Sequence, residues 1–109
     1  MINYSLITGA AGLLGKYHAE ALLQLNLKVI LTDVDKAGLE NTFKHLKKLY
    51  PKKRIIKTIL DVTSHESIKK TVNDLRKKNI IINNLINNAA IDSKVEKKKL
   101  KKKKKFRKF

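Results

Sequence analysis

The sequence predicts an α/β fold in which a parallel sheet of about four strands lies between layers of helices, giving three layers in all. Four short apolar runs alternate with three amphipathic stretches along the 109 residues. The first run opens into a turn with three glycines between Thr8 and Gly15, and the second run ends on the acid Asp33. Parallel strands joined by helices need right-handed crossovers, and from these we expect the strand order 3-2-1-4.

The expected strands are the four apolar runs, at residues 2–8, 28–33, 54–60 and 83–87. The second run is almost uninterrupted, as expected for a strand that is covered on both faces. The expected helices lie at residues 12–25, at 35–50 and in a stretch that begins after Thr63. The first two helices should cover one face of the sheet and the third helix the other, where apolar strand residues would stay exposed.

Helical spacing predicts which side chains of each helix face the sheet. They are Leu14, Tyr17, Ala21, Leu22 and Leu25 in the first helix, Leu39, Phe43, Leu46 and Tyr50 in the second, and Ile68, Val72 and Leu75 in the third. Asn26 is expected to end the first helix in the left-handed conformation, and Pro51 ends the second. Thr63 and Glu66 have the spacing of a capping box at the start of the third helix.

A glycine-rich turn between a strand and a helix, followed by an acid at the end of the next strand, is typical of dinucleotide-binding folds. Gly9 allows the tight turn, Gly12 leaves room for the pyrophosphate, and Gly15 lets the helix pack close to the sheet. The N–H groups that open the helix would face the phosphates. Asp33 lies eighteen residues after Gly15, where an acid hydrogen-bonds the adenosine ribose; the alternative is a helix N-cap, a position for which Asp35 competes.

Two further motifs follow later strands: Asp61-Val62 after the third, and Asn87-Asn88-Ala89-Ala90 after the fourth. With the glycine motif they make residues 3–92 resemble the short-chain dehydrogenase/reductase family, whose domain has a Rossmann-like fold. The resemblance implies that Asp61 hydrogen-bonds the adenine amino group and that the Val62 backbone holds the ring. The cofactor-binding residues implied, besides Asp33, are Thr8, Gly9, Gly12, Leu13, Leu14, Gly15, Asp61, Val62, Asn88, Ala89 and Ala90.

The expected cofactor is NAD rather than NADP, because Asp33 would repel a 2′-phosphate. Lys16 and Lys36 leave NADP as an alternative cofactor, since a nearby cation could accommodate that phosphate. Leu13 stands where the common branch of the resembled family has a glycine. The glycine spacing matches that of the extended branch instead. The motif after the fourth strand, however, differs from the one that the extended branch usually has there. The branch and the substrate therefore stay open.

The resembled family uses a tyrosine as general acid/base, with a lysine four residues later and a serine. A phenol with a pKa of about 10 is a poor base at neutral pH without that cation. Tyr4, Tyr17 and Tyr50 lack such a lysine, and Arg54, four residues after Tyr50, is expected to be structural. We therefore expect the chain to contain no catalytic residue. We expect it to be the NAD(P)-binding part of a truncated alcohol or carbonyl oxidoreductase, and to be inactive alone. The alternatives are a nucleic-acid-binding protein and a nucleotide-sensing module completed by a partner chain.

Positive charge gathers near the C-terminal end. Eleven of the 26 Lys and Arg residues lie at 93–109, against one acid there, Glu96. We therefore divide the chain into a nucleotide-binding domain at 1–92 and a lysine-rich tail at 93–109. Three interpretations of the tail are open: a solvated or frayed helical segment, an arm for nucleic acid or another anionic surface, or the product of a reading frame that slipped in an adenine run.

Composition and spacing bear on other sites and on location. The chain has no cysteine, which excludes disulfides and thiolate metal sites. His18, His45 and His65 lack ligand spacing, so no metal is expected. The absence of an apolar run of about 18 residues and of a basic leading region predicts a cytoplasmic protein without a membrane span. The open edge of the fourth strand would favour self-association.

Overall fold

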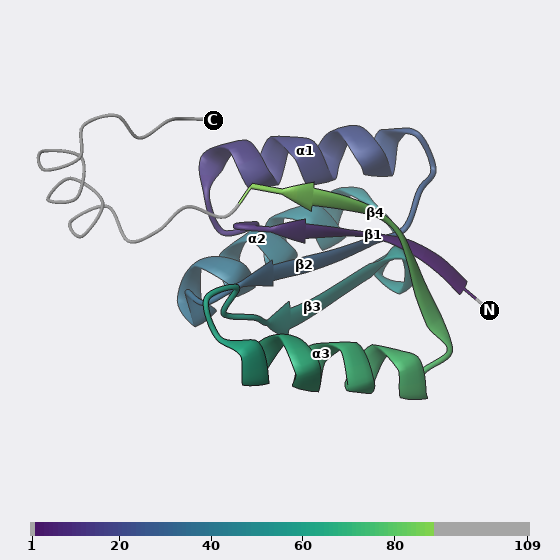
Figure 1. The fold of residues 1–109 in the computed structure, drawn as a ribbon. Coiled ribbons are helices and arrows are strands. Elements are labelled where there is room, and N and C mark those ends of the chain that lie inside the picture. Colours follow the sequence, from purple (N-terminus) through teal and green to yellow (C-terminus); the bar gives the residue numbers. More distant parts are fainter. Residues whose placement is uncertain (1, 89–109) are drawn as a thin grey trace, which may run out of the picture.

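The computed structural model describes residues 2–88, shown as a ribbon in Figure 1. In chain order its elements are β1 (Ile2–Thr8), α1 (Leu13–Gln24), β2 (Val29–Asp33), α2 (Lys36–Leu49), the short 3₁₀ helix η1 (Lys52–Arg54), β3 (Ile55–Ile59), α3 (His65–Lys77) and β4 (Ile80–Asn87). The lysine-rich tail at 93–109 lies outside the described residues, so the structure tests none of the three interpretations of it.

The four strands form one parallel sheet in the order β3-β2-β1-β4, which confirms the predicted fold class and strand order. Helices α1 and α2 cover one face and α3 covers the other, so the molecule has three layers (Figure 1). The strand order reverses beside β1, since β2 lies on one side of it and β4 on the other. In open α/β sheets, ligands bind outside the carboxyl ends of the strands at such a reversal.

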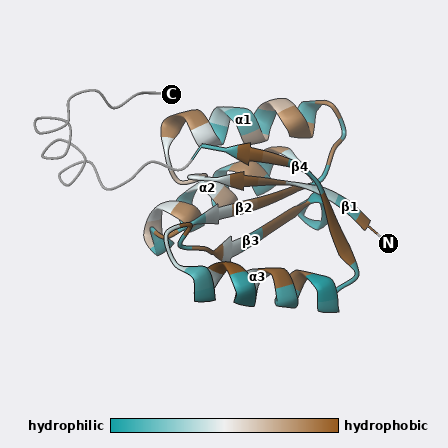
Figure 2. Ribbon diagram, in the orientation of Figure 1, coloured by the Kyte–Doolittle hydropathy of each residue, from teal (hydrophilic) through white to brown (hydrophobic). Residues whose placement is uncertain are grey.

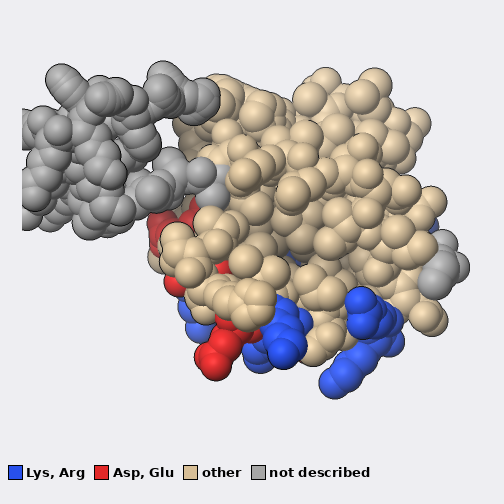
Figure 3. Space-filling model, viewed as in Figure 1, with Lys and Arg blue, Asp and Glu red and all other residues tan. Residues whose placement is uncertain are grey.

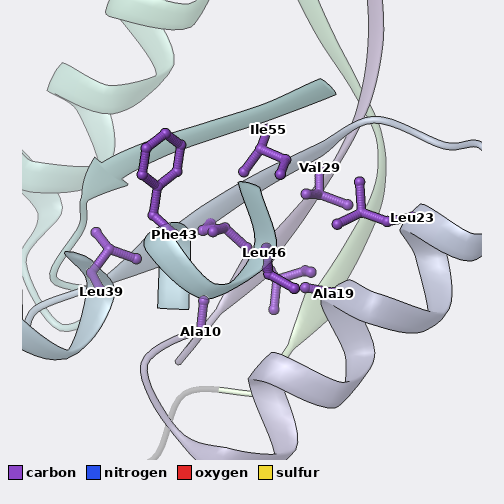
Figure 4. Close-up of a cluster of buried hydrophobic side chains, with 10 residues drawn as sticks. Ala10, Ala19, Leu23, Val29, Leu39, Phe43, Leu46 and Ile55 are labelled. Carbon is purple, nitrogen blue, oxygen red and sulfur yellow. The ribbon is translucent and has the colours of Figure 1, made fainter. Parts of the chain in front are cut away.

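The core lies on both sides of the sheet. The larger cluster, between the sheet and the helices α1 and α2, is drawn in Figure 4. It comprises Ile7, Ala10, Ala19, Leu23, Val29, Leu31, Leu39, Phe43, Leu46 and Ile55. The smaller cluster, on the α3 side, comprises Tyr4, Leu6, Ile30, Leu60 and Leu75. Leu39, Phe43 and Leu46 thus confirm the predicted inner face of the second helix. Tyr50, placed on the same face, also packs against the larger cluster, and it is the C-cap residue of α2.

The predicted inner face of the first helix is wrong. The residues expected inside but found exposed are Leu14, Tyr17, Ala21 and Leu25. The buried residues of α1 are Gly15, Ala19 and Leu23, with Leu22 partly buried. The helix carries two apolar stripes at helical spacing, and the stripe with glycine and alanine allows the backbone to come closer to the sheet. Closeness of the backbone, rather than side-chain size, selects the buried stripe.

Helix ends follow the sequence less closely than the strands do. Asn26 has φ of 65°, which confirms the left-handed stop. The capping box is wrong, because Ser64 caps α3 by accepting a hydrogen bond from the Ser67 N–H at 3.1 Å. η1 was not predicted, and β4 begins three residues before the expected position. The guanidinium of Arg54 donates to the carbonyl oxygens of Leu23 and Leu27, which confirms its structural role.

β4 is hydrophobic along most of its length but sparsely covered (Figure 2). The Leu85 side chain is 62% exposed, and Ile81 and Ile82 are each more than a third exposed. Figure 3 shows that the face over α1 and β4 carries no Lys, Arg, Asp or Glu, whereas charged residues gather over α3. The exposure of apolar strand residues beside the single helix α3 was predicted and is confirmed.

Candidate functional site

The turn between β1 and α1 is held at almost every backbone group. Gly9 has φ of 68°, the left-handed conformation that glycine adopts without strain. The Ala10 N–H donates to the Thr32 carbonyl oxygen at 2.9 Å, and the Gly12 N–H donates to the Gly9 carbonyl oxygen at 3.1 Å. These bonds fix the turn that leads from the carboxyl end of β1 into the first helix.

The start of α1 differs from the starts of the other two helices. Gly12 is its N-cap and supplies no side-chain hydrogen bond, whereas Asp35 caps α2 and Ser64 caps α3. The first intrahelical bond runs from the Lys16 N–H to the Gly12 carbonyl oxygen at 3.1 Å. The N–H groups of residues 13–15 precede that bond and so have no acceptor within the helix. The partial positive charge of the helix start adds to them, which makes this a place suited to an anion.

Gly15 brings the helix against the turn and against the end of β4. A Cβ atom at this position would lie 2.3 Å from the Gly9 carbonyl oxygen and 3.0 Å from Nδ2 of Asn88. The first distance is shorter than real Cβ atoms show, and the second is tighter than nine in ten real Cβ contacts. The close packing expected of Gly15 is therefore found. Leu13 and Leu14, the other candidate residues of this segment, are exposed.

Asp33 binds the turn rather than a helix end. Its Oδ2 accepts a hydrogen bond from the Ala11 N–H at 2.9 Å, and its Oδ1 accepts one from the Asp35 N–H at 2.9 Å. Asp35 is the N-cap of α2, where it accepts from the Gly38 N–H at 3.0 Å. The N-cap alternative for Asp33 is thus wrong. Each carboxylate oxygen has further lone pairs with which it could accept a hydroxyl donor.

The two motif residues after β3 occupy a turn of their own. Both the N–H and the hydroxyl of Thr63 donate to Oδ1 of Asp61, at 2.9 Å and 2.6 Å. These bonds favour the ionised form, so the pKa of Asp61 lies below its usual value, with the hydroxyl bond as the largest cause. Val62 is exposed and borders an apolar hollow of about 340 Å³, which Ile68 and Val72 of α3 and Leu85 of β4 also line.

The end of β4 is tied to the end of β1. The Thr8 hydroxyl lies 3.0 Å from Oδ1 of Asn87, and the Asn88 N–H donates to the Thr8 hydroxyl oxygen at 2.8 Å. Ala89 and Ala90, the last two candidate residues, lie outside the described part of the chain. The structure therefore brings Thr8, the glycine turn and Asn88 together at the reversal of strand order.

The remaining candidates lie along the same edge of the sheet. The Leu60 N–H donates to the Asp33 carbonyl oxygen at 3.1 Å, which joins the exit of β3 to the exit of β2. Lys16 lines a second hollow, of about 270 Å³, between α1 and α2, together with Gly12, Asn41 and His45. His45 pairs with Glu20 at 3.5 Å. Within residues 2–88 no three His, Cys, Asp or Glu side chains form a group that could hold a metal ion.

Sequence reasoning missed two buried hydroxyl groups, of which only that of Thr42 supports the turn from behind. Thr42 on α2 is buried, and its hydroxyl donates to the Ala10 carbonyl oxygen at 3.0 Å. The hydroxyl of Thr32, also buried, donates to the Ile7 carbonyl oxygen at 2.8 Å. A signal for Thr42 was present, since it is a polar residue within the apolar face of an amphipathic helix. Nothing in the sequence indicates which carbonyl a buried hydroxyl would reach.

The chain matches known proteins over most of its length. A family model described as short chain dehydrogenase matches residues 3–109. A search among curated proteins found no match. Menthone neomenthol reductase from Mentha piperita is similar with a TM-score of 0.75 and 23% identity, covering 96% of this chain and 40% of that one. At this identity the likeness concerns the fold alone.

Two solved structures with a cofactor are also similar. NAD⁺-bound xylitol dehydrogenase has a TM-score of 0.71 and 28% identity, covering 82% of this chain and 34% of that one. A short chain dehydrogenase/reductase from Burkholderia phymatum in complex with NAD has a TM-score of 0.61 and 26% identity, covering 69% of this chain and 26% of that one. The chain thus spans between 26% and 40% of the length of the three structures. No helix within residues 2–88 has the length and hydropathy needed to cross a membrane.

Proposed function

Because the chain belongs to the short-chain dehydrogenase family, we propose that it binds a nicotinamide dinucleotide at the carboxyl edge of its sheet. The observation that carries the proposal is the start of α1. Its N-cap offers no side chain, and a fixed turn precedes it, so three successive amides are left for a pyrophosphate. The helix starts of α2 and α3 are closed by their own capping side chains.

In the proposed complex the pyrophosphate lies over residues 12–15 and the adenosine ribose lies beside Asp33. The adenine ring lies against Val62, with Asp61 accepting from its amino group, and Asn88 borders the ribose. Thr8 and Gly9 shape the floor of the site, Leu13 and Leu14 contribute backbone amides, and Ala89 and Ala90 continue the floor beyond Asn88. The two hydrogen bonds from Thr63 orient the carboxylate of Asp61, and an ionised carboxylate is a pure acceptor.

We propose that NAD is preferred over NADP. The carboxylate of Asp33 is held in place by two backbone N–H groups, so it cannot turn away from a 2′-phosphate without losing them. Two like charges held close together disfavour that complex. Lys16 lines the hollow beside Gly12 on the α2 side, and Lys36 is the first residue of α2; these are the two cations that would offset the repulsion.

Calorimetric titration of the full chain with NAD and with NADP tests the proposal. The test variant is Asp33→Asn, and the matched control is Asp35→Asn, which removes an equal charge two residues away and keeps a good N-cap. Asp33→Asn should weaken NAD binding by roughly tenfold or more, as expected for loss of a hydrogen bond to a charged group, and should narrow the preference over NADP. Absence of NAD binding by the folded wild type would overturn the proposal.

We further propose that this chain does not transfer hydride by itself. Hydride transfer to or from an alcohol needs a proton acceptor or donor near its oxygen. None of the three tyrosines has a lysine four residues later. Arg54, which follows Tyr50 at that distance, donates its hydrogen bonds to the carbonyl oxygens of Leu23 and Leu27. A panel of alcohols with NAD should give no increase in absorbance at the NADH wavelength. A saturable rate with any of them would contradict this proposal.

The outer edge of β4 supports a second proposal, self-association of the chain. The nine residues from Ile80 to Asn88 contain no charge and no proline, two of the features with which proteins protect edge strands. The side chains of Ile81, Ile82 and Leu85 are exposed, and the face over α1 and β4 lacks charge (Figure 3). Sedimentation at increasing concentration should show dimers or larger species. A monomer at all concentrations would contradict the proposal.

Nucleic-acid binding through residues 93–109 stays a prediction. It is tested by comparing the full chain with a chain that ends at Asp92, at several salt concentrations, since counterion release makes such binding weaker as salt rises. The cytoplasmic location also stays a prediction, and cell fractionation tests it.

A further inference from the structure

Thr42 is the one buried polar side chain on the inner face of α2. The residue is 4% exposed, and the other buried residues of α2, Leu39, Phe43 and Leu46, belong to the larger core cluster (Figure 4). A valine would fill the same space without placing a hydroxyl in an apolar layer. A buried hydroxyl costs free energy unless it finds a partner, and here the partner is outside the helix. The hydroxyl donates to the Ala10 carbonyl oxygen at 3.0 Å.

Ala10 lies at the centre of the turn that leads into α1. The residue is fully buried, and its N–H donates to the Thr32 carbonyl oxygen at 2.9 Å. The next N–H, that of Ala11, donates to Oδ2 of Asp33 at 2.9 Å. The peptide groups on both sides of Ala10 are therefore fixed by β2 and by α2. Two residues later the chain enters the helix whose first amides are open.

We propose that Thr42 is a positioning residue, which holds the Ala10 carbonyl so that the amides of residues 13–15 are in place before a dinucleotide binds. This inference rests on the proposed function, because it concerns the same site. The physical reason is preorganisation: a turn that is already ordered loses less conformational freedom when the pyrophosphate binds. Without the hydroxyl the Ala10 carbonyl would lack its partner, and the turn could rotate to find another.

The test compares three variants of Thr42 in the full chain. Thr42→Val keeps the shape and removes the hydroxyl, whereas Thr42→Ser keeps the hydroxyl. Thr42→Ala differs from Thr42→Ser by a single oxygen atom, so this pair repeats the comparison if Thr42→Val does not fold. The matched control is Thr32→Val, which removes another buried hydroxyl. That hydroxyl binds the Ile7 carbonyl inside β1, where the sheet already holds the backbone.

NAD affinity by calorimetry and the melting temperature of the free protein are both measured. Thr42→Val and Thr42→Ala should weaken NAD binding by about tenfold, the scale of effect expected when a supporting shell is loosened, and Thr42→Ser should restore it to within about twofold of wild type. Thr32→Val should lower the melting temperature and leave NAD affinity unchanged. A role in stability alone would lower the melting temperature of the Thr42 variants without changing their affinity.

The outcomes separate this inference from the proposed function. If the folded wild type does not bind NAD, the proposed function fails, and this inference fails with it. If the wild type binds and Asp33→Asn weakens binding, but Thr42→Val or Thr42→Ala binds as the wild type does, the positioning role is wrong and the proposed function stands. Equal loss in the Ser and Ala variants would also overturn the role, because the hydroxyl would then not matter.

Discussion

The two strands that border β1, β2 and β4, are both rich in aliphatic residues, yet they have opposite surroundings. In β2, Val29, Ile30, Leu31 and Thr32 are all 0% exposed. In β4 every residue is at least partly exposed, and Leu85 reaches 62%. The difference is one of coverage, since β2 has a strand on each side and helices over it, whereas β4 lies at the edge of the sheet that residues 2–88 form. An apolar run thus predicts a strand, but its burial depends on what the rest of the fold places around it.

The largest expected effect contrasts a leucine from each strand. Leu31→Ala should lower the free energy of unfolding by about 2–5 kcal/mol, because it opens a cavity in the larger core cluster. Leu85→Ala should lower it by less than about 1 kcal/mol, because more than half of that side chain is already in contact with water. Urea denaturation of both variants measures the two values. Equal losses would show that β4 is covered in solution.

The next largest effect separates the two sides of the glycine turn. Gly15→Ala should destabilise the protein by about 1–3 kcal/mol, because its Cβ would press on the Gly9 carbonyl and the β4 end at Asn88. Gly12→Ala should change stability by no more than about 0.5 kcal/mol, since its Cβ would lie 3.5 Å from the nearest atom and its φ of −82° suits any residue.

For NAD binding, unlike for stability, Gly12 is the glycine of the turn at which a larger effect is expected. Gly12→Ala should weaken NAD binding although its fold is intact, because the added methyl group would stand where the pyrophosphate approaches. Thermal melting with and without NAD measures both effects in one experiment. A Gly12→Ala protein that NAD stabilises as well as it stabilises the wild type would contradict the proposed place of the pyrophosphate.

The sequence predicts features that follow from patterns along the chain better than features that depend on how closely two elements approach each other. The strand order, the position of Asp33 beside the turn and the inner face of α2 follow from periodicity and motif spacing, because each of them depends on local patterns. The inner face of α1 does not, since Leu14 and Ala19 lie on competing stripes and the choice depends on how closely the helix approaches the sheet. The support of the turn by Thr42 joins residues 32 positions apart, and no local pattern encodes it.

A smaller effect is expected for the association of chains through β4. Leu85→Lys places a charge on the exposed strand, where it should be tolerated by the fold and should oppose pairing with a second chain. The dissociation constant measured by sedimentation should rise by about tenfold, an amount that corresponds to about 1.4 kcal/mol. Leu31→Lys is no control, because it would unfold the core; Leu49→Lys, on an exposed position at the end of α2, is the matched one.

The smallest effect lies at the other edge of the sheet, in the turn after β3. The pKa of Asp61 is lowered, first by the hydrogen bond from the Thr63 hydroxyl and then by the bond from the Thr63 N–H. A carboxyl group with a lowered folded-state pKa stabilises the fold at pH values above its unfolded pKa of about 3.9, and this contribution is lost as the pH falls through the folded-state value.

Thr63→Val removes the hydroxyl bond and leaves the backbone bond in place. The pKa of Asp61 should therefore rise part of the way to its usual value, and the variant should be slightly less stable than the wild type at neutral pH. The stability difference should vanish at a pH below the folded-state pKa of the wild type. Thr63→Ser keeps the hydroxyl and should behave as the wild type does. A carboxyl titration of Asp61 by NMR measures the shift, and an unchanged pKa in Thr63→Val would show that the hydroxyl bond does not hold Asp61 ionised. Because Ser64 caps α3, none of these changes should unwind that helix, whereas the capping box expected from the sequence predicts that Thr63→Val would.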